Sequence, residues 1–235
     1  MKRLLKKAAK SVLYRASDLL YSLLPRASVM RFYCYLTYTL RVITWRLACR
    51  FYGQDVIKYE GGVDEFVLSN ISSGDRVLDV GCGDGVLTSM IADKAAYVAA
   101  LDMNRRRIDG IDKSAEAFQR IRFIAADVSC VELDEVFDVA VMIHTIEHLE
   151  RSREALGRLA KAARKIVIET PDQTSDWLYM LSRDLGIEDP GDETHVRSYD
   201  AGSLKGELEG SGWTDISLYK DYGVIRAVAR SRLLR

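Results

Sequence analysis

The stretch Arg76–Ala92, RVLDVGCGDGVLTSMIA, decides the fold of this chain. It begins with a short apolar run that is interrupted only by Asp79, and an apolar helical pattern starts at Val86. Between them, glycines stand at alternate positions, Gly81, Gly83 and Gly85. Such a pattern predicts a strand, a tight turn and a helix start. Alternate glycines let the main chain turn sharply and bring its N–H groups close to a ligand at a helix N-terminus, so the stretch is predicted to hold a nucleotide.

The spacing of the glycines indicates which kind of nucleotide the loop binds. The dinucleotide fingerprint is G-x-G-x-x-G, whereas here the glycines run G-x-G-x-G and Asp79 stands two residues before the first. An acid there suits a cationic group, such as an ammonium, better than a pyrophosphate. The D-x-G-x-G-x-G pattern resembles the first motif of class I S-adenosylmethionine-dependent methyltransferases, and the resemblance extends over residues 75–230. It implies S-adenosylmethionine as cofactor and a Rossmann-like α/β fold, with a seven-stranded, mostly parallel sheet, a terminal antiparallel hairpin and here an N-terminal helical extension.

Acids also follow the next two predicted strands. Asp102 ends the strand 97–101, where a doubly wound fold binds a ribose diol. Asp127 follows the strand 122–125, and the resemblance implies that it and the Val128 backbone contact adenine. Capping a helix or forming a turn remains the alternative for both acids. The predicted cofactor contacts are Asp79, Gly81, Cys82, Gly83, Asp102, Met103, Asp127, Val128 and His144.

The candidate chemistry follows the fourth predicted strand, Phe137–Ile143. This strand is apolar at nearly every position, as in a buried parallel strand, and open α/β sheets bind ligands at the carboxyl ends of such strands. The following I-E-H-L resembles the E-H-[LV] motif of small-molecule O-methyltransferases, including the ubiquinone-pathway enzymes. The resemblance implies that His148 takes a proton from the acceptor while Glu147 orients it. One alternative is that the motif only packs the structure. Another is that Glu147 and His148 hold a cation, with or without His144. Because adjacent positions on a helix face different ways, no metal site is predicted.

Two later segments are predicted to border the acceptor. Thr170-Pro171-Asp172 follows the fifth predicted strand, 165–169, and resembles a T-P-N segment of the same branch, from which Asp172 departs. The segment His195–Tyr199, HVRSY, resembles the H-x-R-x-[YF] turn before the last helix. The resemblance implies substrate contacts from Thr170, Pro171, His195 and Arg197. A loop histidine, and an arginine that pairs with nearby acids, are the alternatives.

The remaining pattern alternates as expected for this fold. Apolar periodicity and stop signals predict helices over 63–71, 151–164, 177–185 and 200–212, and closing strands over 213–219 and 223–229. The helix over 177–185 lies in an inserted segment between the two acceptor segments.

The net charge of zero conceals an asymmetry. Residues 1–50 carry 11 Lys and Arg against the single acid Asp18, which leaves the rest of the 235-residue chain at −10. We therefore divide the chain into a basic, aromatic-rich helical extension, residues 1–52, and a cofactor-binding domain, residues 53–235. The four cysteines are scattered without C-x-x-C spacing, which predicts reduced thiols in a cytoplasmic protein.

The extension has three interpretations. Basic and apolar residues separate onto two flanks of a predicted first helix, as in helices that lie on an anionic membrane. The longest charge-free run in the aromatic part, Phe32–Leu40, is too short to cross a bilayer, which takes about 20 residues. A lid over the active site, an anchor on the inner face of the membrane, and an arm that binds nucleic-acid phosphates are all consistent with this composition.

Together these features favour methyl transfer to an oxygen of a small or lipid-linked acceptor, such as a quinone, a sugar or a secondary metabolite. An RNA methyltransferase is less favoured, because no N/D-P-P-[YF] motif follows the fourth strand and the acidic body repels phosphates. A non-catalytic cofactor-binding scaffold is the third possibility, since glycines and acids indicate binding only.

Overall fold

The computed structural model describes residues 2–52, 62–114, 116–172, 174–175, 177–187, 194–221 and 223–234. The chain divides into two compact units. The first, here called the helical unit, comprises residues 1–48 and 177–193; the second, the sheet unit, comprises residues 49–176 and 194–235. The predicted domain boundary at 52/53 adjoins residues outside the described ranges. The inserted segment around residue 180 thus groups with the N-terminal helices, which the sequence-based division did not foresee.

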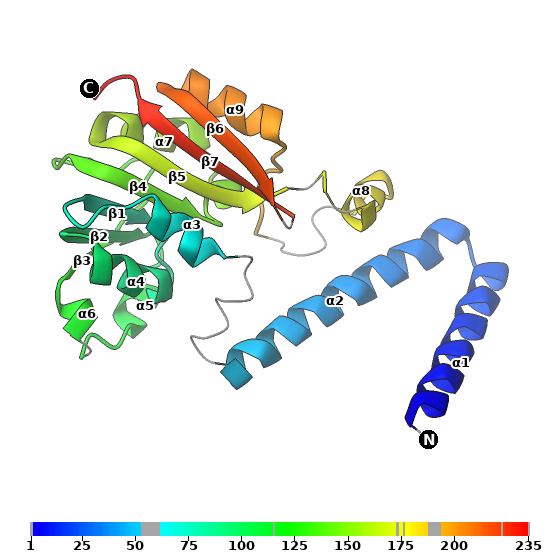
Figure 1. Cartoon of the computed structure of the whole chain (residues 1–235). Coiled ribbons are helices and arrows are strands. Elements are labelled where there is room, and N and C mark those ends of the chain that lie inside the picture. The colour runs from blue at the N-terminus through cyan, green and yellow to red at the C-terminus, as the bar shows by residue number, and fades with distance from the viewer. Residues whose placement is uncertain are drawn as a thin grey trace. The chain divides into compact units, whose positions relative to one another are not determined.

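The sheet unit is built on a seven-stranded sheet (Figure 1). Its strands are β1 (Arg76–Val80), β2 (Tyr97–Asp102), β3 (Ile121–Ala125), β4 (Phe137–Ile143), β5 (Ala163–Pro171), β6 (Trp213–Asp221) and β7 (Val224–Ser231). The spatial order is β3-β2-β1-β4-β5-β7-β6, with parallel pairing from β3 to β5 and antiparallel pairing of β7 with β5 and β6. The predicted mostly parallel sheet with a terminal antiparallel hairpin is confirmed.

Helices cover both faces of this sheet. They are α3 (Val63–Ser69), α4 (Val86–Lys94), α5 (Arg105–Gly110), α6 (Glu116–Gln119), the 3-10 turn η2 (Ile146–His148), α7 (Ser152–Ala162) and α9 (Ala201–Gly210). Side chains alternate along β1, so Leu78 packs in the cluster with α7 and α9, whereas Val77 packs in the cluster with α3, α4 and α5. Both faces of β1 are therefore buried.

The helical unit contains α1 (Lys2–Leu23), α2 (Arg26–Tyr52) and α8 (Trp177–Asp184). A small apolar cluster holds α2 to the segment of α8 through buried Cys34, Tyr38, Leu178 and Ile187. The Arg31 Nε donates to the Leu185 carbonyl at 2.9 Å. The predicted first helix is confirmed, although side chains of residues 2–9 lie outside the described set. Among the described helices, none is both long and apolar enough to cross a membrane.

Several predicted boundaries were wrong for local reasons. The last helix begins at Ala201 rather than at 200, because Asp200 caps it by accepting from the Ser203 N–H. The preceding helix ends at Ala162 rather than at 164, because Ala163 already pairs with Phe137 in the sheet. Strand β5 extends to Pro171 because β7 pairs along it. Smaller differences at the predicted ends 71, 101, 122, 185, 212, 219, 223 and 229 are of one to two residues.

Candidate functional site

The glycine loop is fixed against the end of β2. The N–H groups of Gly81 and Cys82 both donate to the Leu101 carbonyl, at 2.7 and 3.1 Å. The Gly83 N–H donates to Asp102 Oδ2 at 3.0 Å. The loop and the predicted ribose acid are therefore one hydrogen-bonded assembly at the carboxyl edge of the sheet.

Positive φ angles make glycine necessary in this loop. Gly81 and Gly83 have φ values of 81° and 56°. A Cβ on Gly81 would lie 2.2 Å from the Thr145 hydroxyl, whereas a Cβ on Gly83 would meet only the Gly81 carbonyl, at 4.0 Å. Gly81 thus permits close packing against the turn after β4, whereas Gly83 borders open space.

Asp79 is a buried acid beneath the loop. Its side chain is 4% exposed, and Oδ2 accepts from the Thr88 hydroxyl at 2.6 Å. Burial raises the pKa of Asp79 to about 6, with a smaller contribution from Asp102, although the Thr88 hydrogen bond opposes the shift. A cationic ligand group beside Asp79 would lower its pKa again. The raised pKa therefore fits the prediction that Asp79 binds an ammonium group.

Asp102 receives main-chain donors on both oxygens, since Oδ1 accepts from the Asn104 N–H at 2.7 Å. Its neighbour Met103 is exposed. Cys82 is buried, and burial together with Asp79 and Asp102 raises the pKa of its thiol to about 12. The thiol therefore stays protonated, and Cys82 serves packing rather than redox chemistry.

Asp127 lies at the turn after β3 and is half-buried. Its Oδ1 accepts from both the N–H and the hydroxyl of Ser129, and Oδ2 lies 3.2 Å from the Arg151 guanidinium. These donors, Ser129 first, hold the pKa of Asp127 below its usual range. The Val128 side chain is buried in the core, so only its backbone is available to a ligand.

His144 directly follows β4 and has a strained, left-handed conformation, with φ 46°. Its Nδ1 lies 3.4 Å from Glu147 Oε1 and its Nε2 lies 3.2 Å from Glu169 Oε1. Burial of the ring opposes protonation, but the two carboxylates outweigh it and raise the pKa of His144 to about 10. Glu169 in turn accepts from the Arg226 Nε at 2.6 Å. At neutral pH His144 is therefore an imidazolium between two buried acids, and it is no general base.

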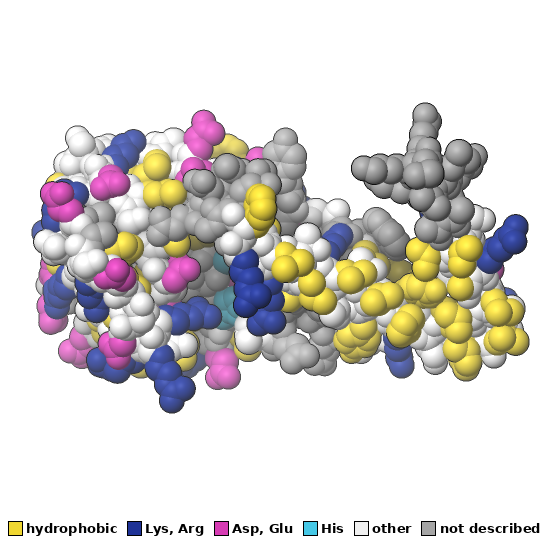
Figure 2. Space-filling model, turned by 90° about the horizontal axis from the view of Figure 1, so that it is seen from below, with side chains coloured by type: hydrophobic (Ala, Val, Ile, Leu, Met, Phe, Trp, Pro, Cys, Tyr) yellow, Lys and Arg dark blue, Asp and Glu magenta, His cyan; other side chains and the backbone are white. Residues whose placement is uncertain are grey.

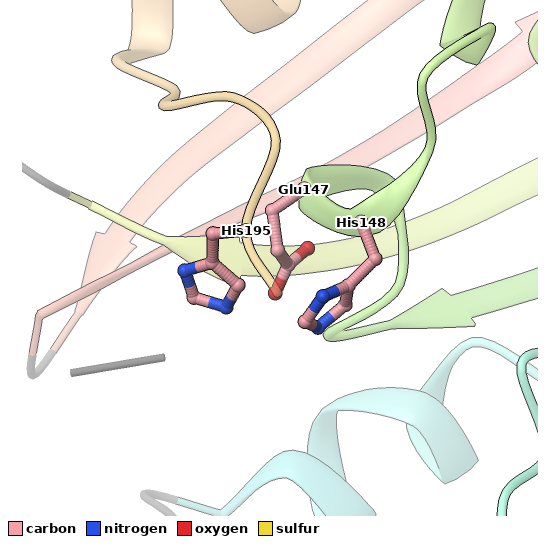
Figure 3. A group of neighbouring side chains, drawn as sticks. All are labelled: Glu147, His148 and His195. Atoms are coloured by element: carbon pink, nitrogen blue, oxygen red, sulfur yellow. The ribbon is translucent and has the colours of Figure 1, made fainter. Parts of the chain in front are cut away.

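The side chains of Glu147, His148 and His195 converge on one another (Figure 3). One ligand atom from each of Glu147, His148 and His195 lies within 4.8 Å of the others. The two rings meet edge to face at 4.6 Å between centroids. The cation set considered from the sequence grouped His144 with Glu147 and His148, but the structure brings His195 to that pair instead. This carboxylate and two imidazoles are a donor set that suits Zn²⁺, Mn²⁺ or Fe²⁺.

The orientation of His148 determines its chemistry. Its Nδ1 lies 3.2 Å from the Thr194 carbonyl and 3.0 Å from the Thr194 hydroxyl. A hydroxyl can donate or accept, but a carbonyl only accepts, so the Thr194 carbonyl favours the tautomer with the proton on Nδ1 and the lone pair on Nε2. His148 can therefore take a proton or bind a cation through Nε2.

The predicted acceptor residues have different environments. Thr170 is fully buried and donates to Glu147 Oε2 at 3.0 Å, so it acts on the site through Glu147. Pro171 is partly exposed at the end of β5. The turn that carries His195 is bound to η2, because the Val196 and Arg197 N–H groups donate to the Glu147 carbonyl at 3.0 and 3.3 Å.

Sequence reasoning missed the residue that supports this turn. Glu207 on α9 accepts from the hydroxyls of Ser152 and Tyr199 and lies 3.6 Å from the Arg197 guanidinium. It is buried beside Leu208, and an acid on the inward face of a predicted helix was a usable signal. Glu169 and Thr194 were missed as well, and no local pattern identifies them.

The strand order, the antiparallel closing strands and the acid–glycine loop together define the fold of class I S-adenosylmethionine-dependent methyltransferases. A family described as a methyltransferase domain matches residues 58–218, and the chain belongs to this family.

Similar proteins include both oxygen and nitrogen methyltransferases. The mitochondrial ubiquinone biosynthesis O-methyltransferase of Schizosaccharomyces pombe is 30% identical over 112 residues, which are 45% of this chain and 41% of that protein. The (S)-tetrahydroprotoberberine N-methyltransferase of Eschscholzia californica is 30% identical over 96 residues, 39% of this chain and 27% of that protein. The chain thus spans less than half the length of these curated relatives.

Solved structures share the fold. The N-methyltransferase NodS from Bradyrhizobium japonicum, in complex with S-adenosylhomocysteine, has a TM-score of 0.57 at 17% identity and covers 76% of this chain and 88% of its own. The magnesium protoporphyrin IX methyltransferase from Synechocystis, also with S-adenosylhomocysteine, has a TM-score of 0.57 at 18% identity, with 78% and 86% covered.

Proposed function

We propose that this chain transfers the methyl group of S-adenosylmethionine to an oxygen of a small, hydrophobic acceptor, with His148 as general base. The single observation that carries this proposal is the hydrogen bond from His148 Nδ1 to the Thr194 carbonyl, because it leaves the Nε2 lone pair at the carboxyl end of β4. S-adenosylmethionine supplies an activated methyl group when bound.

The cofactor residues fit this ligand. Asp79 would accept from its ammonium, Asp102 would hold the ribose hydroxyls, and Asp127 with the Val128 backbone would contact adenine. Gly81, Cys82 and Gly83 would border it through their main chain, with Met103 and His144 beside it. The open space at Gly83 supports this fit, since a side chain there would occupy the volume of a bound ligand.

Catalysis would depend mainly on position. Glu147 accepts from the Thr170 hydroxyl and lies 3.4 Å from His144 Nδ1, and these contacts would fix its orientation in the pocket. His148 Nε2 would take the acceptor hydroxyl proton as the oxygen bonds to the methyl carbon, while the sulfur–methyl bond would break and S-adenosylhomocysteine would leave. The base would contribute about 10²–10⁴-fold. Alignment of the two reacting groups supplies the larger part, about 7–11 kcal/mol.

The finer acceptor class is a lipid-linked quinone, sugar or secondary metabolite that the chain meets at the inner face of an anionic membrane. The basic charge of residues 1–50 supports this assignment, as does the named substrate pathway of one relative. Nitrogen methylation is the second candidate, and the N-methyltransferases among the relatives and neighbours favour it. An oxygen acceptor needs the base, whereas a neutral amine attacks without one.

Calorimetric titration with S-adenosylhomocysteine tests the cofactor half. We expect micromolar binding to the wild type and loss of about tenfold or more in Asp102→Ala, a change equivalent to about 1.4 kcal/mol. Asp112→Ala is the matched control, because Asp112 is an exposed acid outside the loop. Absence of binding to the wild type would refute the proposed function.

Labelled methyl transfer to a lipid extract tests the acceptor half, with His148→Gln as the catalytic variant. We expect the variant to bind S-adenosylhomocysteine normally and to lose methylation of oxygen acceptors. Normal rates in His148→Gln would favour an amine acceptor, transfer to RNA would favour the nucleic-acid alternative, and binding without transfer would favour a scaffold. Loss of transfer with a chelator, restored by Mn²⁺, would assign the Glu147–His148–His195 group to a cation.

A further inference from the structure

Exposed hydrophobic side chains concentrate on the helical unit. Of the 23 large hydrophobic side chains that are exposed in the described part of the chain, 17 lie between Val12 and Phe51. Figure 2 shows hydrophobic side chains gathered along these helices, whereas charged side chains intersperse the surface of the sheet unit. A soluble monomer rarely exposes such a concentration without a partner.

These side chains form a stripe along one side of α2. Phe32, Leu36, Leu40, Ile43 and Leu47 follow one another at intervals of four, four, three and four residues, which puts them on one helix face. Each is between 39% and 58% exposed. The buried Cys34 and Tyr38 belong to the other side, where the α8 segment packs. Helix α2 therefore has two apolar faces, one covered and one exposed.

Helix α1 continues this pattern. Val12, Leu19 and Leu23 share one face and are 66%, 58% and 70% exposed. The described part of α1 and α2 also carries Lys10, Arg15, Arg26, Arg31, Arg41, Arg46 and Arg50, against the single acid Asp18. An apolar face beside basic residues matches a surface that is both apolar and anionic, which is the interface of an anionic lipid bilayer.

The α8 segment connects this unit to the proposed active site through the chain itself. We call residues 173–194 the inserted arm. At its start, Asp172 pairs with Tyr199 in an isolated bridge and donates its N–H to the Gly223 carbonyl at 2.8 Å. At its end, the Thr194 carbonyl holds His148 Nδ1 at 3.2 Å. The residues at both ends are thus fixed in the sheet unit, and Thr194 contacts the proposed base directly.

The middle of the arm is fixed in the other unit. Leu178 and Ile187 are buried with Cys34 and Tyr38, and the Leu185 carbonyl accepts from Arg31. The chain from Ile187 to Thr194 passes through residues outside the described ranges, and it joins the segment packed on α2 covalently to Thr194.

We propose that α1 and α2 dock on an anionic bilayer through the exposed stripe, and that the inserted arm transmits this docking to the Thr194–His148 contact. The docking half stands on the surface alone, whereas the coupling half rests on the proposed function. Docking would act on α2 and, through the covalent connection to Thr194, hold the proposed base in its working orientation where a lipid-linked acceptor arrives.

Vesicle flotation of the full chain tests the docking half. The probe is phosphatidylcholine vesicles with or without about one third phosphatidylglycerol, at low and high salt. We expect binding only to the anionic vesicles, and a loss of about tenfold or more in the double variant Leu36→Ser/Leu40→Ser. The matched control is Tyr35→Ser/Val42→Ser, which removes two exposed apolar side chains off the stripe and should bind nearly as the wild type.

Three results would overturn the docking half. They are equal binding by the stripe and control variants, self-association through the stripe in the absence of lipid, and tight RNA binding without vesicle binding. Circular dichroism of each variant distinguishes loss of docking from loss of folding.

Hydrogen exchange tests the coupling half in protein loaded with S-adenosylhomocysteine. Anionic vesicles should slow exchange of the Val196 and Arg197 amides, which donate to Glu147, by about fivefold or more in the wild type. Leu178→Asn should still float with vesicles but lose the slowed exchange of these amides, because it removes an apolar contact between the α8 segment and α2. Vesicle binding without protection in the wild type would overturn the coupling half. Failure to bind S-adenosylhomocysteine would instead refute the proposed function and leave the docking result intact.

Discussion

Replacement of Gly81 by alanine provides a quantitative test of how the loop packs on the turn after β4. The new Cβ would lie 2.2 Å from the Thr145 hydroxyl and 2.7 Å from its methyl group. A left-handed φ costs an alanine about 1–2 kcal/mol, and the forced overlap adds about 1–3 kcal/mol. We therefore expect Gly81→Ala to lower the free energy of unfolding by about 2–5 kcal/mol in urea denaturation.

Gly83→Ala is the matched control, because it carries the same backbone strain with open space around the Cβ. Gly83→Ala should lose only about 1–2 kcal/mol of stability. It should also weaken S-adenosylhomocysteine binding, and by more than this loss of stability accounts for. A double-mutant cycle of Gly81→Ala with Thr145→Ala should show a favourable coupling of about 1–3 kcal/mol. Equal losses in the two glycine variants, or strictly additive effects in the cycle, would contradict the packing argument.

Three further predictions concern the buried polar groups. The pKa of Asp79 is raised from 3.8 to about 6, so ionisation of its side chain costs stability as pH rises through that window. In urea titrations, Asp79→Asn should therefore gain up to about 3 kcal/mol of stability over the wild type between pH 4 and pH 7. A stability difference that stays constant with pH would refute this prediction. The pKa of His144 is raised from 6.5 to about 10, so the stabilising positive charge of its ring is fully present below pH 6.5 and is lost towards pH 10. We therefore expect His144→Gln to lower stability by about 1–3 kcal/mol at neutral pH. This difference should disappear in thermal melts at alkaline pH. Glu207→Ala leaves two hydroxyls and a guanidinium without their acceptor and should cost about 2–4 kcal/mol, whereas Glu209→Ala on the exposed side of α9 should cost less than about 0.5 kcal/mol; similar losses would show that the buried acceptor is unimportant.

The sequence predicted those parts of the fold that local pattern determines. The strand Phe137–Ile143 was predicted with both ends correct, because a run of buried apolar residues ends where polar ones begin. The glycine loop was predicted because its positive φ angles require glycine. The order of acids after successive strands was predictable too, since parallel strands bring their carboxyl ends to one edge.

The candidate site was only partly predictable, because its contacts join distant parts of the chain. His148 and the Thr194 carbonyl are 46 residues apart, and no local feature of either segment indicates that they meet. His195 was predicted near an acceptor, but its convergence with Glu147 follows from the backbone bonds that attach its turn to η2. Within the inserted arm a helix was predicted over 177–185, yet the packing of this helix on α2 depends on a tertiary apolar cluster.

The charges at the carboxyl edge of the sheet differ in how they are balanced, and this difference points to the ligand. Glu169 is balanced by Arg226 and His144 within the fold. The groups that set the pKa of Asp79 are its own burial, Thr88 and another acid, Asp102, and none of these is cationic. A buried carboxylate without a cation is costly when ionised, and a bound ammonium removes that cost. We therefore expect the uncompensated charge of Asp79 to favour a ligand that is cationic at this end.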